Sequence, residues 1–236
     1  MCAELGVPSV RMVHGQPDIG QLEGAALVVF NSETSRALVD WTGPAVVCRP
    51  VTWPDEHRVT ATGDRWAQVN LSPAKGGELF RLIVTSLPDV KFLAVRGGYG
   101  GQVMPTRSAN VEIMAMTGEM RDVWSRARGL LMPSESETWG MVAVEAAVNG
   151  LPVIAHPCAG IIEALGDAPV YVDRDDLAGW RAAIRELDDP VSYAERSAAS
   201  TAAAARLDPH DSVARFVTAV ETIGAPHADV ATACHP

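Results

Sequence analysis

Two glutamates, Glu137 and Glu145, stand eight residues apart on either side of a Trp-Gly step. An apolar run, G-L-L-M-P at 129–133, precedes them, and a second run, P-V-I-A at 152–155, follows. This pattern predicts a strand, a loop, a helix and a second strand, with Glu137 in the loop and Glu145 inside the helix. A loop acid beside a helix N-terminus suits a ligand that carries both an anionic group and several hydroxyls. A nucleotide sugar fits that description.

Gly140 would permit close approach at the start of the predicted helix, where free backbone amides would face a diphosphate. Glu145 would accept hydrogen bonds from ribose hydroxyls, and Glu137 from sugar hydroxyls. The alternative is that both are solvated surface acids. Against it, Glu145 lies within M-V-A-V-E-A-A-V, and a carboxylate among apolar neighbours needs a partner because burying it alone is costly.

A second motif, S-P-A-K-G-G at 72–77, follows the apolar run at 66–70. Gly76 and Gly77 would let backbone amides approach a ligand where the next helix begins, and Lys75 would add a positive charge. Together these features describe a phosphate site. An ordinary turn with a solvated lysine is the alternative, since the motif lacks the spacing of a P-loop.

The segments that must position these residues alternate between short apolar runs and amphipathic stretches. Strands are expected at 10–14, 26–30, 45–48, 66–70, 92–96, 129–132, 152–155 and 169–172. Helices are expected at 32–40, 76–87, 119–127, 141–149, 160–165, 175–187, 190–207 and 210–223. This alternation predicts an α/β protein with parallel sheets that are covered on both faces.

The expected domain boundaries follow from shifts in composition. The polar, proline-containing segment 49–65 is interpreted as an interdomain linker, so that residues 1–60 form a first lobe with its linker. Residues 61–188 form a second α/β lobe, residues 189–223 form C-terminal helices, and residues 224–236 form a disordered tail. The first lobe supplies only two or three strands, which is few for an independent domain.

Composition restricts the class of protein. With 236 residues, of which 47% are apolar, the chain can bury a sizeable core, and its net charge of -10 argues against a surface that binds a nucleic-acid backbone. Four scattered cysteines, Cys2, Cys48, Cys158 and Cys234, indicate reduced thiols in a cytoplasmic protein. No apolar stretch is long enough for a membrane span, and the N-terminus does not resemble a signal peptide.

Other polar clusters indicate less chemistry. The aspartates of D-R-D-D at 173–176 are interpreted as a solvated helix start rather than a metal site, and His156 and Cys158 lack further ligands at zinc spacing. The glycine run R-G-G-Y-G-G at 96–101 lacks the spacing of a dinucleotide-binding loop, and the sequence contains no G-x-S-x-G motif of a hydrolase. We therefore predict no metal and no cofactor.

The segment E-T-W-G-M-V-A-V-E-A-A-V-N-G-L-P-V-I-A resembles the E-x7-E signature of the retaining GT-B glycosyltransferases (family 4-like, group 1). Trp139 stands where that family commonly has Phe, Gly160 falls at its loop glycine, and Glu163 at its later acid. S-P-A-K-G-G resembles the family's R-L-x-x-x-K-G segment, in the same order and spacing. The resemblance covers residues 66–187 well and extends to small glycosyltransferases encoded by actinobacterial phages.

The resemblance implies a GT-B-like fold of two Rossmann-like lobes, with the N-terminal lobe truncated. It also implies that Lys75 binds the donor diphosphate, Glu137 the transferred sugar and Glu145 the ribose, while His14 lies on the acceptor side. Lys75, Glu137 and His14 are thus the expected catalytic residues. The further expected donor-binding residues are Asn70, Gly76, Gly77, Arg96, Glu112, Ile113, Met114, Trp139, Gly140, Met141 and Val142.

By the same resemblance, the helix-start amides of Met141 and Val142 would contact the phosphates, and the segment 112–114 would frame the base. The family's diphosphate-binding arginine falls at the neutral Asn70, and Arg96 is its expected replacement. For His14, a purely structural role at the end of a strand stays open.

The activity that the resemblance implies is transfer of a hexose from a nucleotide diphosphate sugar to an acceptor hydroxyl, with retention of anomeric configuration and without a metal. Because the acceptor-side lobe is short, the chain is interpreted as a minimal enzyme, a fragment, or one part of a homo-oligomer that completes the cleft. Two alternatives stay open: a non-catalytic nucleotide-sugar-binding subunit that needs a partner lobe, and a nucleotide-sugar epimerase. A protein or small-molecule acceptor is favoured over DNA because the chain is acidic.

Overall fold

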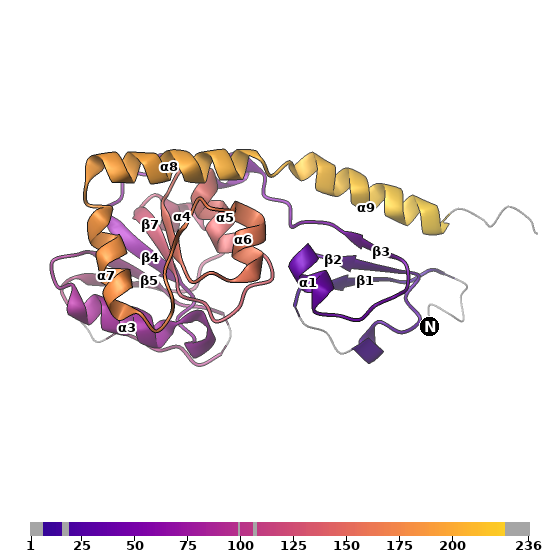
Figure 1. Cartoon of the computed structure of the whole chain (residues 1–236), viewed down its shortest axis with the longest axis horizontal. Coiled ribbons are helices and arrows are strands. Elements are labelled where there is room, and N and C mark those ends of the chain that lie inside the picture. The colour runs from indigo at the N-terminus through magenta and orange to yellow at the C-terminus, as the bar shows by residue number, and fades with distance from the viewer. Residues whose placement is uncertain (1–6, 16–18, 99, 106–107, 225–236) are drawn as a thin grey trace, which may run out of the picture. The chain divides into compact units, whose positions relative to one another are not determined.

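The chain folds into two α/β units, each built on a parallel sheet (Figure 1). The computed structural model describes residues 7–15, 19–98, 100–105 and 108–224. The first unit combines Met1–Val51 with Pro209–Pro236, and the second unit is Thr52–Asp208. The expected α/β class with parallel sheets is therefore confirmed.

The second unit is organised around a sheet of six parallel strands. Across the sheet the strands follow the order β6 (Val111–Met114), β5 (Phe92–Val95), β4 (Arg65–Val69), β7 (Ala127–Met132), β8 (Val153–Ala155) and β9 (Val170–Tyr171). Counted along the chain within this unit, the order is third, second, first, fourth, fifth and sixth, which is the doubly wound arrangement. The order reverses between β4 and β7, and ligands of such sheets bind outside the carboxyl ends of the strands at that point.

Helices cover both faces of this sheet. One face packs against α3 (Gly77–Ser86) and α7 (Leu177–Glu186), and the other against α5 (Met141–Val148), α6 (Ala159–Leu165) and α8 (Pro190–Ala205). Neighbouring residues of β4 show why: Trp66 is buried in the core with α3 and α7, whereas Ala67 is buried in the core with α5. Successive side chains of a strand point to opposite faces, so a strand that is apolar on both faces requires two helical layers.

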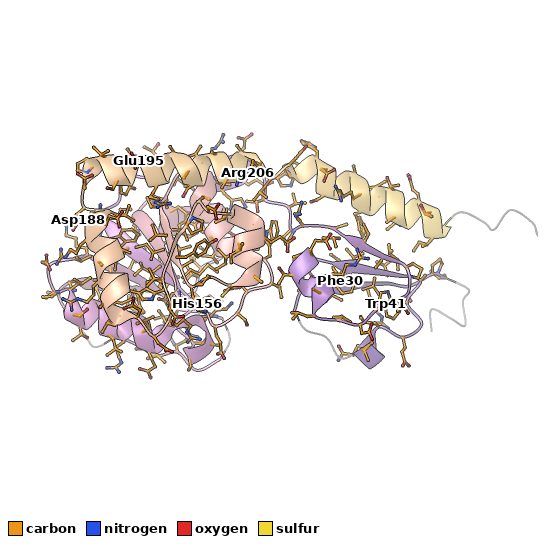
Figure 2. The ribbon with its side chains drawn as sticks, viewed as in Figure 1. Phe30, Trp41, His156, Asp188, Glu195 and Arg206 are labelled. Carbon is orange, nitrogen blue, oxygen red and sulfur yellow. The ribbon has the colours of Figure 1, made fainter. Side chains whose placement is uncertain are left out.

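The first unit has a smaller parallel sheet in the order β1 (Val10–Val13), β2 (Leu27–Phe30) and β3 (Ala45–Val47). The central strand β2 is buried along its whole length. The remaining elements are the 3-10 turn η2 (Ile19–Gln21), the short helix α1 (Glu33–Ala37) and the long helix α9 (Pro209–Gly224), which packs against β2 and β3. Figure 2 labels two residues of this unit: Phe30 is buried in its apolar core, and Trp41 is partly buried and packs against that core.

The C-terminal helices differ from the expected segment 189–223. Helix α8 packs against α5 and α6 in the second unit, whereas α9 packs against strands of the first unit. The two helices follow each other in the sequence but pack in different units. The chain therefore passes from one unit to the other twice, after Val51 and after Asp208. The expected linker 49–65 also divides: from Thr52 on it belongs to the second unit, where it includes α2 (Pro54–His57) and the first residue of β4. The expected tail, 224–236, lies outside the described residues apart from Gly224.

One further expectation about elements was wrong, and one strand was missed. The helix expected at 119–127 is only the short α4 (Arg121–Trp124), because Ala127 already begins the buried strand β7. Periodicity also failed to predict β6, whose V-E-I-M sequence places a charge in a half-exposed edge strand. An edge strand has one partner and little burial, so its apolar pattern is weak.

Candidate functional site

The two motifs come together at the point where the strand order reverses. The loop 70–76 follows β4, and the loop 133–140 follows the neighbouring strand β7. The backbone N–H of Glu135 donates to the carbonyl oxygen of Ala74 at 2.8 Å, which joins the loops directly. Because parallel strands end at the same edge of the sheet, adjacent strands carry adjacent loops.

Lys75 and Glu137 form an ion pair across this junction. The Nζ atom of Lys75 lies 2.6 Å from Oε1 of Glu137, and the two side chains are 24% and 11% exposed. Each charge is thus compensated by the other at a partly buried position, where an unpaired charge would be costly. The structure brings together the cation and the acid that were assigned to adjacent parts of one ligand.

The turn that carries Lys75 is the 3-10 segment η3 (Pro73–Lys75). It is followed by Gly76, which has a φ of +79°. A Cβ atom on Gly76 would lie 2.4 Å from the carbonyl oxygen of Pro133, and one on Gly77 would lie 2.1 Å from that of Leu71. Close backbone packing therefore explains why both positions are glycine.

The backbone amides of the two glycines are used inside the turn. The N–H of Gly76 donates to the carbonyl of Pro73 at 2.9 Å, and the N–H of Gly77 donates to that of Ser72 at 3.1 Å. In this conformation they are not available to a ligand, in contrast to the expectation from the sequence. Among the described donors near the junction are the Lys75 ammonium and the first backbone amides of α5.

Helix α5 begins beside the Glu137 loop with Gly140 at its N-cap, in the left-handed conformation at a φ of +83°. The first residue of the helix to donate within it is Ala143, whose N–H bonds the carbonyl of Gly140 at 2.9 Å. The amides of Met141 and Val142 precede that bond, and the first N–H groups of a helix have no partner within it. Anion binding by these two amides stays a prediction.

Glu145 lies in the second part of α5 and is only 8% exposed. Its Oε2 atom and Nε1 of Trp124 are both buried, and neither has a partner at hydrogen-bonding geometry among the described residues, although the indole is near enough to act on the pKa of the carboxyl. Burial raises the pKa of the Glu145 carboxyl above its ordinary value, while the nearby His57 and Trp124 side chains act in the opposite direction. A buried acceptor without a donor is a group that an incoming hydroxyl would satisfy.

Asn70 supports the loop after β4. Its φ is +65°, and its Oδ1 accepts hydrogen bonds from the backbone of Ser72 at 3.1 Å and from Gln102 Nε2 at 3.0 Å. Gln102 Oε1 in turn accepts from the backbone of Leu71 at 2.8 Å. Arg96, the expected replacement for the missing arginine, is exposed at the end of the neighbouring strand β5.

Several expected site residues are not part of this junction. Glu112 pairs with Arg126 at 2.7 Å and with Arg65 at 3.1 Å, and Arg65 is the first residue of β4, so these pairs lie toward the amino edge of the sheet. Ile113 is 40% exposed on the edge strand, and within β6 only Met114 reaches its carboxyl end. The segment 112–114 as a whole is therefore not directed at the two loops.

Trp139 and His14 are also placed differently from the other expected residues. Trp139 is 2% exposed and belongs to the apolar core of the second unit, so its indole packs inside the protein. His14 follows β1 in the first unit, where its carbonyl accepts from Asn31 Nδ2 at 3.5 Å, while the remaining expected residues are all in the second unit.

The structure adds residues around the junction that the sequence did not reveal. Gln68, 1% exposed in β4, donates from Nε2 to the carbonyl of Lys75 at 3.0 Å. Arg174, which follows β9, donates from Nη2 to the carbonyl of Pro73 at 3.1 Å. Asp176 does cap α7. The sequence pattern D-R-D-D indicated only a helix start and did not single out Arg174. Its position after the last strand was the signal that could have indicated it.

Cys158 is close to the charged groups of the junction. Burial, and then the negative charge of Glu137, raise the pKa of the Cys158 thiol to about 11, while Lys75 and Arg174 act in the opposite direction. The thiol donates to the carbonyl of Ser134 at 3.3 Å. Its high pKa keeps Cys158 protonated at neutral pH, so the thiol serves as a donor that holds the loop.

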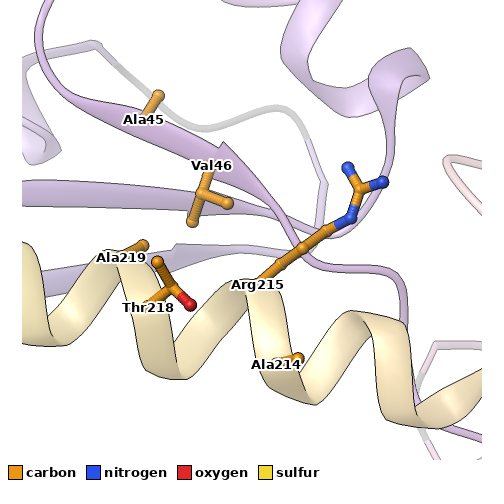
Figure 3. A pocket seen from close by; sticks show the side chains of 6 residues that line it. All are labelled: Ala45, Val46, Ala214, Arg215, Thr218 and Ala219. Carbon is orange, nitrogen blue, oxygen red and sulfur yellow. The ribbon is translucent and has the colours of Figure 1, made fainter.

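In the described ranges no three His, Cys, Asp or Glu side chains gather in a way that could hold a metal ion. None of the helices in those ranges combines the length and the apolar composition that crossing a membrane requires. The first unit contains a hollow of about 430 Å³ between β3 and α9, lined by small side chains and Arg215 (Figure 3). None of the expected site residues lines that hollow.

Comparison with known proteins gives this site a context. Residues 78–189 match the family model described as "Glycosyl transferases group 1". The folds of solved GT-B glycosyltransferases match the structure: the Anabaena protein HepE in complex with UDP and glucose superposes with a TM-score of 0.77 at 16% identity, over 94% of this chain and 73% of that one. Sucrose-phosphate synthase from Thermosynechococcus elongatus superposes with a TM-score of 0.75 at 18% identity, over 92% of this chain and 68% of that one.

Curated proteins of similar sequence include a glycosyltransferase and a glycogen synthase. A D-inositol 3-phosphate glycosyltransferase of Thermobispora bispora is 40% identical over 88 residues, which make up 36% of this chain and 21% of that relative. A glycogen synthase of Mycobacterium tuberculosis is 36% identical over 85 residues, which make up 35% of this chain and 20% of that enzyme. The chain thus covers about a fifth of the length of these curated relatives.

Proposed function

We propose that this chain transfers a hexose from a nucleotide diphosphate sugar to an acceptor hydroxyl, with retention of anomeric configuration. The observation that carries the proposal is the 2.6 Å contact between Lys75 Nζ and Glu137 Oε1 where the strand order reverses. In a nucleotide diphosphate sugar the sugar is bonded directly to a phosphate. A cation for the phosphate and an acid for sugar hydroxyls must therefore lie side by side.

The proposed chemistry is electrostatic. Departure of the diphosphate places negative charge on a phosphate oxygen, which Lys75 and the helix-start amides of Met141 and Val142 stabilise in the transition state. These groups come from a lysine and a helix start, so the proposal needs no metal ion. Donor binding draws the Lys75 ammonium toward the phosphate and frees Glu137 to accept from sugar hydroxyls.

Glu145 is the proposed contact of the ribose. Its buried Oε2 has no hydrogen-bond donor among the described residues. Two neighbouring ribose hydroxyls are donors of the kind that a carboxylate accepts, and the hydrogen bonds to them offset the cost of burying the charge.

Retention is the finer part of the proposal and is supported by the resemblance to the retaining family. The acceptor hydroxyl attacks the anomeric carbon on the face from which the diphosphate leaves, and the leaving phosphate oxygen takes the acceptor proton. The bond between the sugar and the phosphate breaks as the new glycosidic bond forms. The phage-type resemblance stays a prediction.

The acceptor is proposed to be a small molecule or a protein. The names of the relatives include an inositol phosphate glycosyltransferase and a glycogen synthase, which differ in their acceptors. The net charge of -10 disfavours DNA. The comparisons favour neither the epimerase nor the non-catalytic subunit, and a homo-oligomer stays a prediction.

Thermal unfolding in the presence of a panel of UDP, GDP and ADP sugars tests the donor site. We expect at least one donor to stabilise the wild type, and Lys75→Ala and Glu145→Ala to lose that stabilisation. Lys91→Ala is the matched control, because Lys91 pairs with Asp64 next to the amino end of β5. If no donor stabilises the wild type, the assignment is wrong. If both variants respond as the wild type does, the residue roles are wrong.

A second experiment addresses the chemistry. The donor that stabilises the wild type is incubated with candidate acceptors, and the product is analysed by NMR. The proposal expects the anomeric configuration of the donor in the product. An inverted anomer would contradict retention while leaving the donor site intact.

A further inference from the structure

Arg174 reaches the candidate site from the last strand of the sheet. It follows β9, and its side chain is 26% exposed. Nη2 donates to the carbonyl of Pro73 at 3.1 Å, and Nη1 lies 3.6 Å from Oε2 of Glu135. One guanidinium therefore contacts both loops, the one that carries Lys75 and the one that carries Glu137.

The turn that carries Lys75 is held from more than one side. Pro73 begins the turn that Lys75 ends, so the contact of Arg174 with Pro73 fixes its first residue. Gln68 fixes its last residue through the carbonyl of Lys75. Arg174 has a rigid planar fork of donors, so it can bond two acceptors in fixed directions at once.

The positive charge of Arg174 also acts on the Cys158 thiol next to the two loops. It lowers the pKa of the Cys158 thiol, as Lys75 does, whereas Glu137 raises it. Because Asn70 is neutral, Arg174 contributes positive charge next to a loop that otherwise has Lys75 alone among the residues of 70–77.

We propose that Arg174 is a positioning residue of the donor site: it holds the Lys75 turn against the Glu137 loop and thereby keeps the Lys75 ammonium where a diphosphate can reach it. This inference rests on the proposed function. The guanidinium is already engaged with a carbonyl and a carboxylate, so its effect on the ligand passes through Lys75.

The first test needs no ligand. Hydrogen exchange of the Lys75, Gly76 and Gly77 amides, which all donate within the turn, is measured by NMR in the full chain. We expect Arg174→Ala to accelerate exchange there about tenfold, since a hydrogen bond from a charged group is lost. Arg174→Lys should lie between that variant and the wild type. Arg181→Ala, an exposed arginine of α7, is the matched control and should change nothing.

Unchanged exchange in Arg174→Ala would overturn the proposal. So would an acceleration spread evenly over the second unit, since that indicates general destabilisation rather than release of the turn. A turn-specific acceleration that Arg174→Lys partly reverses supports it.

The second test measures binding of UDP, GDP, ADP and inorganic pyrophosphate by calorimetry. In the wild-type background, we expect Arg174→Ala to weaken binding of the tightest nucleoside diphosphate about tenfold. In the Lys75→Ala background it should weaken binding little further, because the effects of residues that act as a unit are not additive. Equal losses in both backgrounds would overturn the proposal. If the wild type binds none of the probes, the proposed function fails, and amide exchange alone decides whether Arg174 holds the turn.

Discussion

Lys75 Nζ lies 2.6 Å from Glu137 Oε1, although the two residues are 62 positions apart in the chain. Each residue follows a different strand, and the strands are neighbours in the sheet. The pair therefore exists only because β4 and β7 are adjacent. It compensates both charges before any ligand binds, and it sets the distance between the proposed phosphate and sugar contacts.

The pair should contribute to stability. Lys75→Ala leaves a largely buried carboxylate without its partner, so we expect it to lower the free energy of unfolding by about 1 kcal/mol. Adding Glu137→Gln removes the uncompensated charge and should restore part of the loss. Urea denaturation of both single variants and the double variant measures the coupling, and strict additivity would contradict a direct interaction.

The two glycines of the Lys75 turn should tolerate no Cβ atom. We expect Gly76→Ala to destabilise the protein by about 1–3 kcal/mol, because it combines a positive φ with a clash against Pro133. Gly77→Ala meets the carbonyl of Leu71 and should behave similarly. Gly118→Ala is the matched control, since a Cβ atom there meets nothing within 4 Å. Comparable midpoints of urea denaturation for all three variants would contradict the packing.

Glu145 should make stability depend on pH. Burial raises its pKa in the folded state, so folding favours the protonated acid. Ionisation of Glu145 therefore lowers the free energy of unfolding. This loss is absent below the ordinary pKa of a glutamate, about 4.3, and grows as the pH rises from there through the pKa of the folded state. We expect Glu145→Gln to have a higher melting temperature than the wild type at pH 7 and a smaller advantage toward pH 4. A difference that does not change with pH would contradict this.

Glu112 and Trp139 should be dispensable for donor affinity. Glu112→Ala breaks exposed ion pairs with Arg126 and Arg65, each of which contributes about 0–1 kcal/mol, and should leave donor binding unchanged. Trp139→Phe reduces the volume of a core side chain and should lower the melting temperature without altering the donor dissociation constant. If either variant lost donor affinity while its stability was unchanged, that residue would belong to the donor site and the prediction would be wrong.

The local features of the site were predictable from the sequence. The S-P-A-K-G-G motif does follow a strand, Glu137 does lie in a loop, and Glu145 does lie on a helix among apolar residues. These features depend on hydrophobic periodicity and on residues close in sequence, which determine strands, loops and helix starts. The α/β class follows from the same alternation.

Glu112 and the glycine amides show where such prediction ends. The position of Glu112 on β6 was recognisable by resemblance, but its pairing with Arg126, which stands just before β7, depends on how the whole sheet is assembled. The amides of Gly76 and Gly77 were expected to face a ligand, yet the chain bonds them within its own turn. A hydrogen-bonding group takes whichever partner the folded chain brings to it.

The sequence by itself determined the kinds of element and the chemistry carried by each motif. Only the tertiary structure decided that the loops after β4 and β7 share one junction, that Arg174 reaches it from β9, and that α9 packs with the first unit. The physical reason is that local patterns specify which face of an element is apolar. The choice among possible neighbours depends on packing all those faces together at once.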